Sequence, residues 1–253
     1  MSKSKISTKT LFGRATADDL QDLVDYVTKP VTGLLYQTDQ YKEHFPDHPK
    51  YAKEILKEIK AFGGNTIVNT VRGGGPRYRK VVADVADKIG VPDVDEGRHS
   101  VAELERRIIV KILKDAMDST EAKDREEIEQ ALKDAGVSAK DLSVLFSGGA
   151  VASVIAARLS GFALYRVSLI VANGVAKHVL GRGLSFAANV TLTRSLAVFA
   201  GPIGWVITGL WTLVDLAGPA YRVTIPCVIH VATLRLKYLS EDDAAGPTSA
   251  RTE

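Results

Sequence analysis

Acidic side chains are almost absent from a long stretch of this chain. Between Leu142 and Ser240 the only acidic residue is Asp215, against eight Lys or Arg residues. Residues 1–141 carry 24 Lys or Arg and 25 Asp or Glu, a formal charge of −1, whereas residues 142–240 carry +7. A water-exposed region normally scatters carboxylates over its surface, while a region that meets lipid keeps basic groups near the headgroups. The composition therefore predicts two parts built for different surroundings, the second one at a membrane surface.

Cysteine is also nearly absent, since Cys227 is the only one. A disulfide within the chain and a cysteine-based metal cluster are therefore excluded. Cys227 lies in an apolar run, which predicts a buried thiol with a raised pKa rather than a nucleophile. The five histidines lack the spacing of a zinc-protease helix, and no serine stands in a nucleophile-elbow pattern. We therefore predict a protein that is not an enzyme and has no metal site and no cofactor.

A secretory signal is lacking as well, because residues 1–13 are polar and basic. Any membrane contact is then expected from the cytoplasmic side, through the acid-poor region. We predict a cytoplasmic location with peripheral or integral association with the inner membrane.

Period-two alternation is lacking too, apart from a short β-branched run at residues 223–225. Caps and glycine stops instead bound helical patterns: Thr16 and Ser100 precede helices, and Gly63 and Gly90 end others. We predict an all-α fold, in which a charged N-terminal helical domain is followed by an apolar, Gly/Ala-rich, basic helical region that could form a helical hairpin. The expected divisions are a flexible N-terminus at 1–15, the charged domain at 16–141, the apolar basic region at 142–240 and a disordered tail at 241–253.

One stretch passes the length test for crossing a bilayer. Ser195–Val214 has about the 20 uncharged residues that a membrane-spanning helix needs. Pro202 and several glycines interrupt it, so a bent hairpin fits at least as well as a straight span. Trp205 and Trp211 could anchor the stretch at a membrane interface or lie in a protein core.

Small residues recur at four-residue spacing in the apolar region. Such a row places small side chains on one face of a helix and lets a second backbone approach closely, in lipid or in a soluble helical core. Asp215 must be exposed or paired, and we expect an ion pair with Arg222 or Arg194. The packing candidates are Gly149, Ser153, Ala157 and Gly161 in one row, and Ala200, Gly204 and Thr208 in another.

Three consecutive glycines beside basic side chains form a candidate anion or phosphate site. Glycines ahead of a helix expose backbone N–H groups, and the helix dipole favours an anion there. The Gly-Lys-Ser/Thr end of a nucleotide-binding loop is missing, so nucleotide hydrolysis has no support. A glycine turn beside a solvated basic surface is the simpler interpretation. The candidate residues are Arg72, Gly73, Gly74, Gly75, Arg77, Arg79 and Lys80.

Two longer stretches resemble the YaaW family of uncharacterised bacterial proteins. The first runs from Phe62 to Asn69 and continues through Val71-Arg72-Gly73 to Tyr78-Arg79, and the second is Ala220–Pro226 with the following Leu234-Arg235. Gly201-Pro202-Ile203-Gly204 is similar as well, and the resemblance spans about Thr16 to Leu239. It implies a bacterial protein whose helical N-terminal region is remotely grouped with ubiquinol-cytochrome c chaperones, and it implies no reaction.

The residues and the resemblance together favour a non-enzymatic, membrane-associated helical protein that binds a partner, in chaperone-like fashion, at the bacterial inner membrane. Anionic lipid is the expected partner, and a protein partner or a second copy of the chain is also open. One alternative is a pore-forming or membrane-perturbing effector. The other is a soluble oligomer whose arginine-glycine loop contacts nucleic acid, and nucleic acid is the least favoured of the expected partners.

Overall fold

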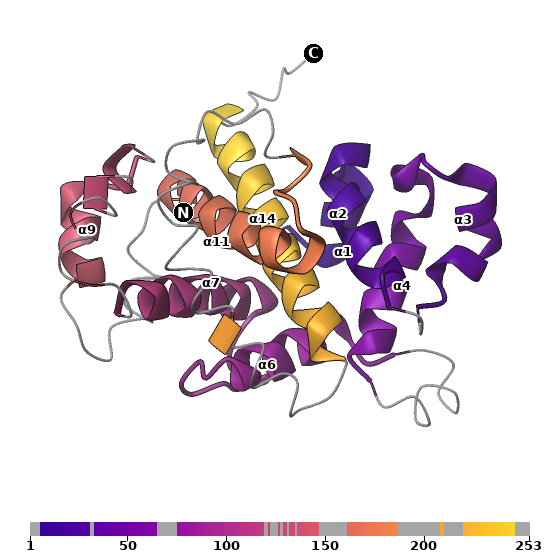
Figure 1. Cartoon of the computed structure of the whole chain (residues 1–253), viewed down its shortest axis with the longest axis horizontal. Helices are drawn as coiled ribbons and strands as arrows, with labels where there is room; N and C mark the ends of the chain where they lie inside the picture. The colour runs from indigo at the N-terminus through magenta and orange to yellow at the C-terminus, as the bar shows by residue number, and fades with distance from the viewer. Residues whose placement is uncertain are drawn as a thin grey trace, which may run out of the picture.

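The computed structural model describes residues 6–30, 33–64, 75–118, 121, 126, 129–130, 132–134, 136–146, 161–186, 208–209 and 220–245. Within these ranges the chain forms helices and turns and no strand, which confirms the all-α prediction. None of the helices in these ranges is long and apolar enough to cross a membrane. The helices are α1 (Thr8–Arg14), α2 (Ala17–Thr28), α3 (Asp39–His44), α4 (Ala52–Phe62), α6 (Tyr78–Lys88), α7 (Val101–Asp118), α9 (Ala139–Phe146), α11 (Gly161–Leu180) and α14 (Tyr221–Ala245), with the 3₁₀ turns η1 (Leu35–Gln37) and η2 (His48–Tyr51) (Figure 1).

The helix ends follow local chemistry. Thr16 and Asp19 make a reciprocal capping box at the start of α2, and the Ser100 hydroxyl accepts from the backbone N–H of Glu103 at the start of α7. Gly63 caps the end of α4, and Gly90 follows α6 with a φ of 75°, a conformation that favours glycine. These boundaries confirm the predicted helix starts and stops.

Helix α14 is the centre of the molecule. It runs from top to bottom through the middle of Figure 1 and packs most extensively on α11, with further contacts to α2, α4, α6 and α7. It is buried on nearly all sides, from Val223 to Tyr238, as expected of a helix that is apolar all round. The β-branched run at 223–225 belongs to this helix, because burial among other helices overrides its weak preference for a strand.

Both parts of the chain contribute to one hydrophobic core. Leu23 on α2, Ile108 on α7, Val171 on α11 and Ile229 on α14 all belong to it and are fully buried. The boundary at residue 141 stays a prediction, since the described helices on its two sides share this core.

Helices occupy part of both predicted end segments, 1–15 and 241–253. Leu11 and Phe12 are buried in the core, and their burial holds α1 in place. At the other end α14 continues to Ala245, and Arg14 pairs with Asp242 at 2.9 Å. Helix α1 thus packs beside the last turns of α14.

Candidate functional site

The most deeply buried ion pair joins α14 to α7. Arg235 Nε lies 2.5 Å from Glu105 Oε2, Arg235 Nη2 lies 3.1 Å from Glu105 Oε1, and the two side chains are 4% and 1% exposed. The Tyr78 hydroxyl on α6 donates to Glu105 Oε1 at 3.2 Å. Burial alone would lower the pKa of Arg235, but the Glu105 carboxylate outweighs it and raises that pKa. The pair therefore ties three helices together through one charged contact.

A second carboxylate, Asp19 on α2, binds two side chains of α14. Lys237 Nζ lies 2.7 Å from Asp19 Oδ1, and the Tyr238 hydroxyl donates to Asp19 Oδ2 at 2.6 Å. Burial alone would raise the pKa of Asp19, but the hydrogen bonds from Lys237 and Tyr238 outweigh it and hold that pKa below its ordinary value. Asp19 is therefore an ionised partner for α14 as well as the cap of its own helix.

A third contact holds the turn after α11 against α2. Arg182 Nη1 lies 2.7 Å from Asp22 Oδ1, and its Nη2 binds Asp25. The backbone N–H and the hydroxyl of Ser185 donate to Asp22 at 2.8 and 2.9 Å. Arg182, Arg235 and Lys237 thus find in the N-terminal part the carboxylates that residues 142–240 lack, and they need no lipid headgroup as a partner.

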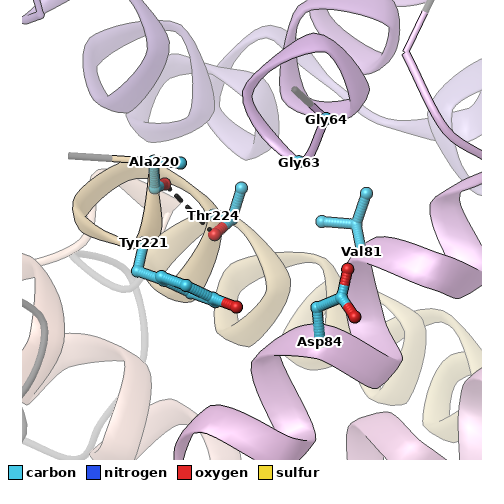
Figure 2. A pocket seen from close by; sticks show the side chains of 7 residues that line it. All are labelled: Gly63, Gly64, Val81, Asp84, Ala220, Tyr221 and Thr224. Carbon is cyan, nitrogen blue, oxygen red and sulfur yellow. Dashed lines mark hydrogen bonds between the residues drawn. The ribbon is translucent and has the colours of Figure 1, made fainter. Parts of the chain in front are cut away.

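A pocket of about 180 Å³ lies where the two parts of the chain meet (Figure 2). It is formed by the end of α4, one face of α6 and the start of α14. A Cβ at Gly63 would lie 2.5 Å from Val81 Cγ2, so glycine lets the end of α4 approach Val81 closely. The lining residues are Gly63, Gly64, Val81, Asp84, Ala220, Tyr221 and Thr224.

The pocket brings together the two stretches that resemble the YaaW family. Gly63 and Gly64 come from the first stretch, and Ala220, Tyr221 and Thr224 come from the second, more than 150 residues later. This convergence makes the pocket the candidate functional site. Sequence reasoning did not single out Tyr221 or Thr224, although both lie in a quoted stretch.

The polar groups of the pocket are a carboxylate, a phenol and a hydroxyl. Asp84 Oδ1 binds Lys80 on the preceding turn of α6, and the Thr224 hydroxyl donates to the carbonyl of Ala220 at 3.2 Å. Figure 2 shows the Tyr221 side chain and the Asp84 carboxylate on opposite walls of the pocket. Burial, with the nearby charges of Asp84 and Asp87, raises the pKa of Tyr221, so its phenol stays protonated at neutral pH.

The predicted anion site is only partly within the described residues. Arg72, Gly73 and Gly74 lie outside them, and Arg77 is exposed. Arg79 Nη1 donates to the Glu96 carbonyl at 2.6 Å, and Lys80 is held by Asp84. A Cβ at Gly75 would lie 2.2 Å from the Lys60 carbonyl oxygen, so this glycine serves a close backbone contact with α4. Two of the predicted cations thus already have local acceptors, and anion binding stays a prediction.

The other predicted residues fall mostly outside the described part. Gly161 is the exposed first residue of α11, and Thr208 is exposed. Arg222 lies in the first turn of α14, but its expected partner Asp215 is not in the described ranges. The rest are Gly149, Ser153, Ala157, Ala200, Gly204, Trp205 and Trp211, all of them outside those ranges. The helix-packing rows, the tryptophan anchors and the Asp215 pair stay predictions.

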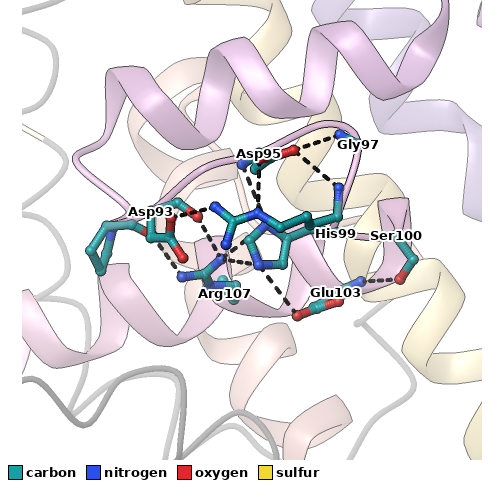
Figure 3. A network of polar contacts seen from close by, with 9 residues as sticks. Asp93, Asp95, Gly97, His99, Ser100, Glu103 and Arg107 are labelled. Atoms are coloured by element: carbon teal, nitrogen blue, oxygen red, sulfur yellow. Dashed lines mark hydrogen bonds and ion pairs between the residues drawn. The ribbon is translucent and has the colours of Figure 1, made fainter.

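The loop between α6 and α7 holds a dense polar network (Figure 3). Asp95 accepts from the backbone N–H groups of Gly97 and Arg98 at 2.7 and 3.0 Å, and the Arg98 side chain bridges Asp95 to Asp93. The hydrogen bond from the Arg98 side chain, with the two backbone bonds, lowers the pKa of Asp95 to about 2. Arg107 donates to backbone carbonyls of the same loop, which fixes the start of α7. These polar side chains form their hydrogen bonds within the loop and with α7, so we interpret the network as structural.

Cys227 is fully buried in α14, and burial raises the pKa of its thiol, as predicted. Among the described residues no group of three or more His, Cys, Asp or Glu side chains could hold a metal ion.

Comparison with known proteins identifies relatives over most of the chain. A UPF0174 protein of Helicobacter pylori strain J99 is 40% identical over 198 residues, which cover 78% of this chain and 76% of the relative. Another, from strain 26695, is 34% identical over 80% of this chain and 96% of the relative, and UPF0174 protein YaaW of Escherichia coli K12 is 27% identical over 81% of each. No protein-family model and no solved structure matches the chain. The chain belongs to the UPF0174 family of bacterial proteins, which confirms the resemblance to YaaW.

Proposed function

We propose that the protein acts by binding rather than by catalysis, as a helical domain that associates with the bacterial inner membrane. The observation that carries the proposal is the charge distribution within residues 187–219, which contain Arg194 and Asp215 as their only charged residues. The uncharged run Ser195–Val214 within them is long enough to meet the hydrocarbon of a bilayer.

The ion pairs of the described helices limit the proposed membrane contact to the run Ser195–Val214. Arg182, Arg235 and Lys237 form ion pairs with Asp22, Glu105 and Asp19. Helices α11 and α14 bury most of their apolar side chains in the core, with Phe162 at the start of α11 51% exposed. These parts of the acid-poor region are therefore explained without lipid. The run at 195–214 is uncharged in sequence and long enough for the bilayer core, so it is the segment to which we assign membrane contact.

Partner binding is assigned to the opposite end of the chain. Leu34 and Phe45 are more than half exposed and Tyr36 is 42% exposed, on η1 and at the end of α3, two elements that pack together. Exposed apolar side chains gathered on neighbouring elements are typical of protein contacts. A chaperone-like role would use this surface while the apolar run holds the protein at the membrane.

Flotation of the full chain with anionic liposomes tests the membrane proposal. The wild type should float, and Ile207→Asp should not, because a carboxylate at the centre of a membrane-inserted helix costs roughly 2.5–3.5 kcal/mol. Leu34→Asp is the matched control, since it places the same charge on an exposed leucine of the helical domain, and it should float like the wild type. Equal recovery of wild type and Ile207→Asp in the liposome fraction, or no flotation of the wild type, would contradict the proposal.

Release of a trapped dye separates docking from the pore-forming alternative. Docking predicts that liposomes keep their dye when the wild type floats with them. Dye release that is abolished by Ile207→Asp would instead favour a membrane-perturbing effector.

A further inference from the structure

The pocket between α4, α6 and α14 presents mainly hydrogen-bond acceptors. The Thr224 hydroxyl uses its proton on the Ala220 carbonyl, which leaves its oxygen lone pairs available. Asp84 uses Oδ1 for Lys80, and its Oδ2 has no hydrogen bond to the described residues. The two glycines stand at the C-terminal end of α4, where the helix dipole is negative. A ligand that donates hydrogen bonds and carries positive charge fits these groups.

Three carboxylates lie near the pocket. Asp84 and Asp87 both lie close enough to Tyr221 to raise its pKa, and Glu96 Oε1 lies 3.7 Å from Lys80 Nζ. Three cations lie nearby and each contacts a group of the protein: Lys80 the Asp84 carboxylate, Lys88 the Tyr221 ring and Arg79 the Glu96 carbonyl. These positive and negative side chains balance, so the preference for a cation comes from the acceptor groups that line the pocket.

The protein's own lysines show how an ammonium group binds at this place. Lys80 Nζ binds the Asp84 carboxylate, and Lys88 Nζ lies 5.7 Å from the centroid of the Tyr221 ring, at cation–π distance. The aromatic ring and the carboxylate are therefore both groups that contact an ammonium in this protein.

We propose that this pocket binds a small aliphatic primary ammonium compound, with its ammonium group on Asp84 and Thr224 and its carbon chain against Val81 and Tyr221. Its volume of about 180 Å³ is below that of sites for drug-sized ligands, and it has room for about six heavy atoms at the roughly 30 Å³ that a water molecule takes in the liquid. None of the lining residues named above belongs to the run 195–214, and this proposal does not rest on the membrane proposal.

Titration of the full chain with n-butylammonium, followed by NMR or calorimetry, tests this site. The wild type should show saturable binding, while n-butanol, of the same shape without the charge, and butyrate, of opposite charge, should not bind. Asp84→Asn should weaken binding on the order of 10- to 100-fold, as expected for the loss of a charge-assisted hydrogen bond. Thr224→Val should weaken it by a smaller factor.

Asp115→Asn is the matched control, because Asp115 also forms a partly exposed pair with a lysine four residues away on its helix. It should bind n-butylammonium like the wild type. Thermal unfolding checks that Asp84→Asn folds, which we expect because a surface pair of this kind contributes little stability. Four results would each overturn the proposal. They are equal affinity of wild type and Asp84→Asn for n-butylammonium, equal affinity of the wild type for n-butanol, a preference for butyrate, and no saturable binding by the wild type.

Discussion

Breaking the pair between Glu105 and Arg235 should be among the most damaging changes in the described core. Glu105→Leu leaves a guanidinium that is 4% exposed with no carboxylate beside it, and Arg235→Met leaves a carboxylate that is 1% exposed. Removing one partner of a buried ion pair typically costs about 3–5 kcal/mol, because the other charge stays buried and uncompensated. We therefore expect each single substitution to lower the free energy of unfolding by about that amount.

The double substitution should cost much less than the sum of the two. With both charges gone, the penalty left is the loss of hydrogen bonds to the Tyr78 hydroxyl and to the Ile6 carbonyl, on the order of 1–3 kcal/mol for each group left unpaired. The combined variant Glu105→Leu with Arg235→Met is thus expected to resemble one single substitution, which gives a coupling energy of about 3–5 kcal/mol.

Urea denaturation followed by far-ultraviolet circular dichroism measures all four members of this cycle. Asp115→Asn provides the control, since its pair with Lys111 is partly exposed and should change stability by less than about 1 kcal/mol. Additivity of the two single substitutions to within about 0.5 kcal/mol would refute the assignment of Glu105 and Arg235 as a coupled buried pair.

Two further predictions concern pH and glycine. Burial lowers the pKa of His230, so the unfolded chain binds a proton that the folded one does not, and stability should be complete above pH 6.5 and decrease below it. Chemical denaturation at several pH values should show that His230→Gln reduces this slope, by at most about 1.4 kcal/mol per pH unit, and an unchanged slope would contradict the assignment. Gly75→Ala should destabilise by about 1–3 kcal/mol, because its Cβ would meet the Lys60 carbonyl oxygen at 2.2 Å. Gly13→Ala, in α1 with nothing within 4 Å, should instead stabilise by up to about 1 kcal/mol, and thermal unfolding of both variants compares them.

Local signals in the sequence predicted the helix boundaries well, because caps and stops act over a few residues. Helices begin after Thr16 and Ser100, and helices end at Gly63 and just before Gly90, as expected. The buried thiol of Cys227 was likewise predictable from its apolar neighbours. Each of these predictions depended only on residues that are close to one another in the sequence.

The partners of the basic residues could not be found in this way. Arg235 meets a carboxylate 130 positions earlier, and Lys237 meets one 218 positions earlier. Composition showed that residues 142–240 lack acids, and lipid was one explanation of that lack. The N-terminal part supplies the acids instead, which only the tertiary arrangement of α2, α7 and α14 reveals.

The candidate pocket shows the same limit. The quoted stretches around Gly63 and Tyr221 pointed to its two ends, but no pattern connected them to Asp84 on α6. The loop at residues 72–80 was predicted to bind an anion because its basic residues are close together in sequence. In the structure Arg79 donates to the Glu96 carbonyl and Lys80 binds the Asp84 carboxylate. The two candidate sites therefore come from different signals, the loop from charge density along the chain and the pocket from the convergence of distant stretches.

Hydrogen exchange on the full chain, with and without anionic liposomes, tests the central claim most directly, namely that α14 is a core helix of one domain and that membrane contact belongs to residues 195–214. Peptides from α2 and α14 should exchange equally slowly in both conditions, because they share one core, while peptides from 195–214 should gain protection when liposomes are added. Faster exchange in α14 than in α2, loss of protection in α14 on liposomes, or no change in 195–214 would contradict the account.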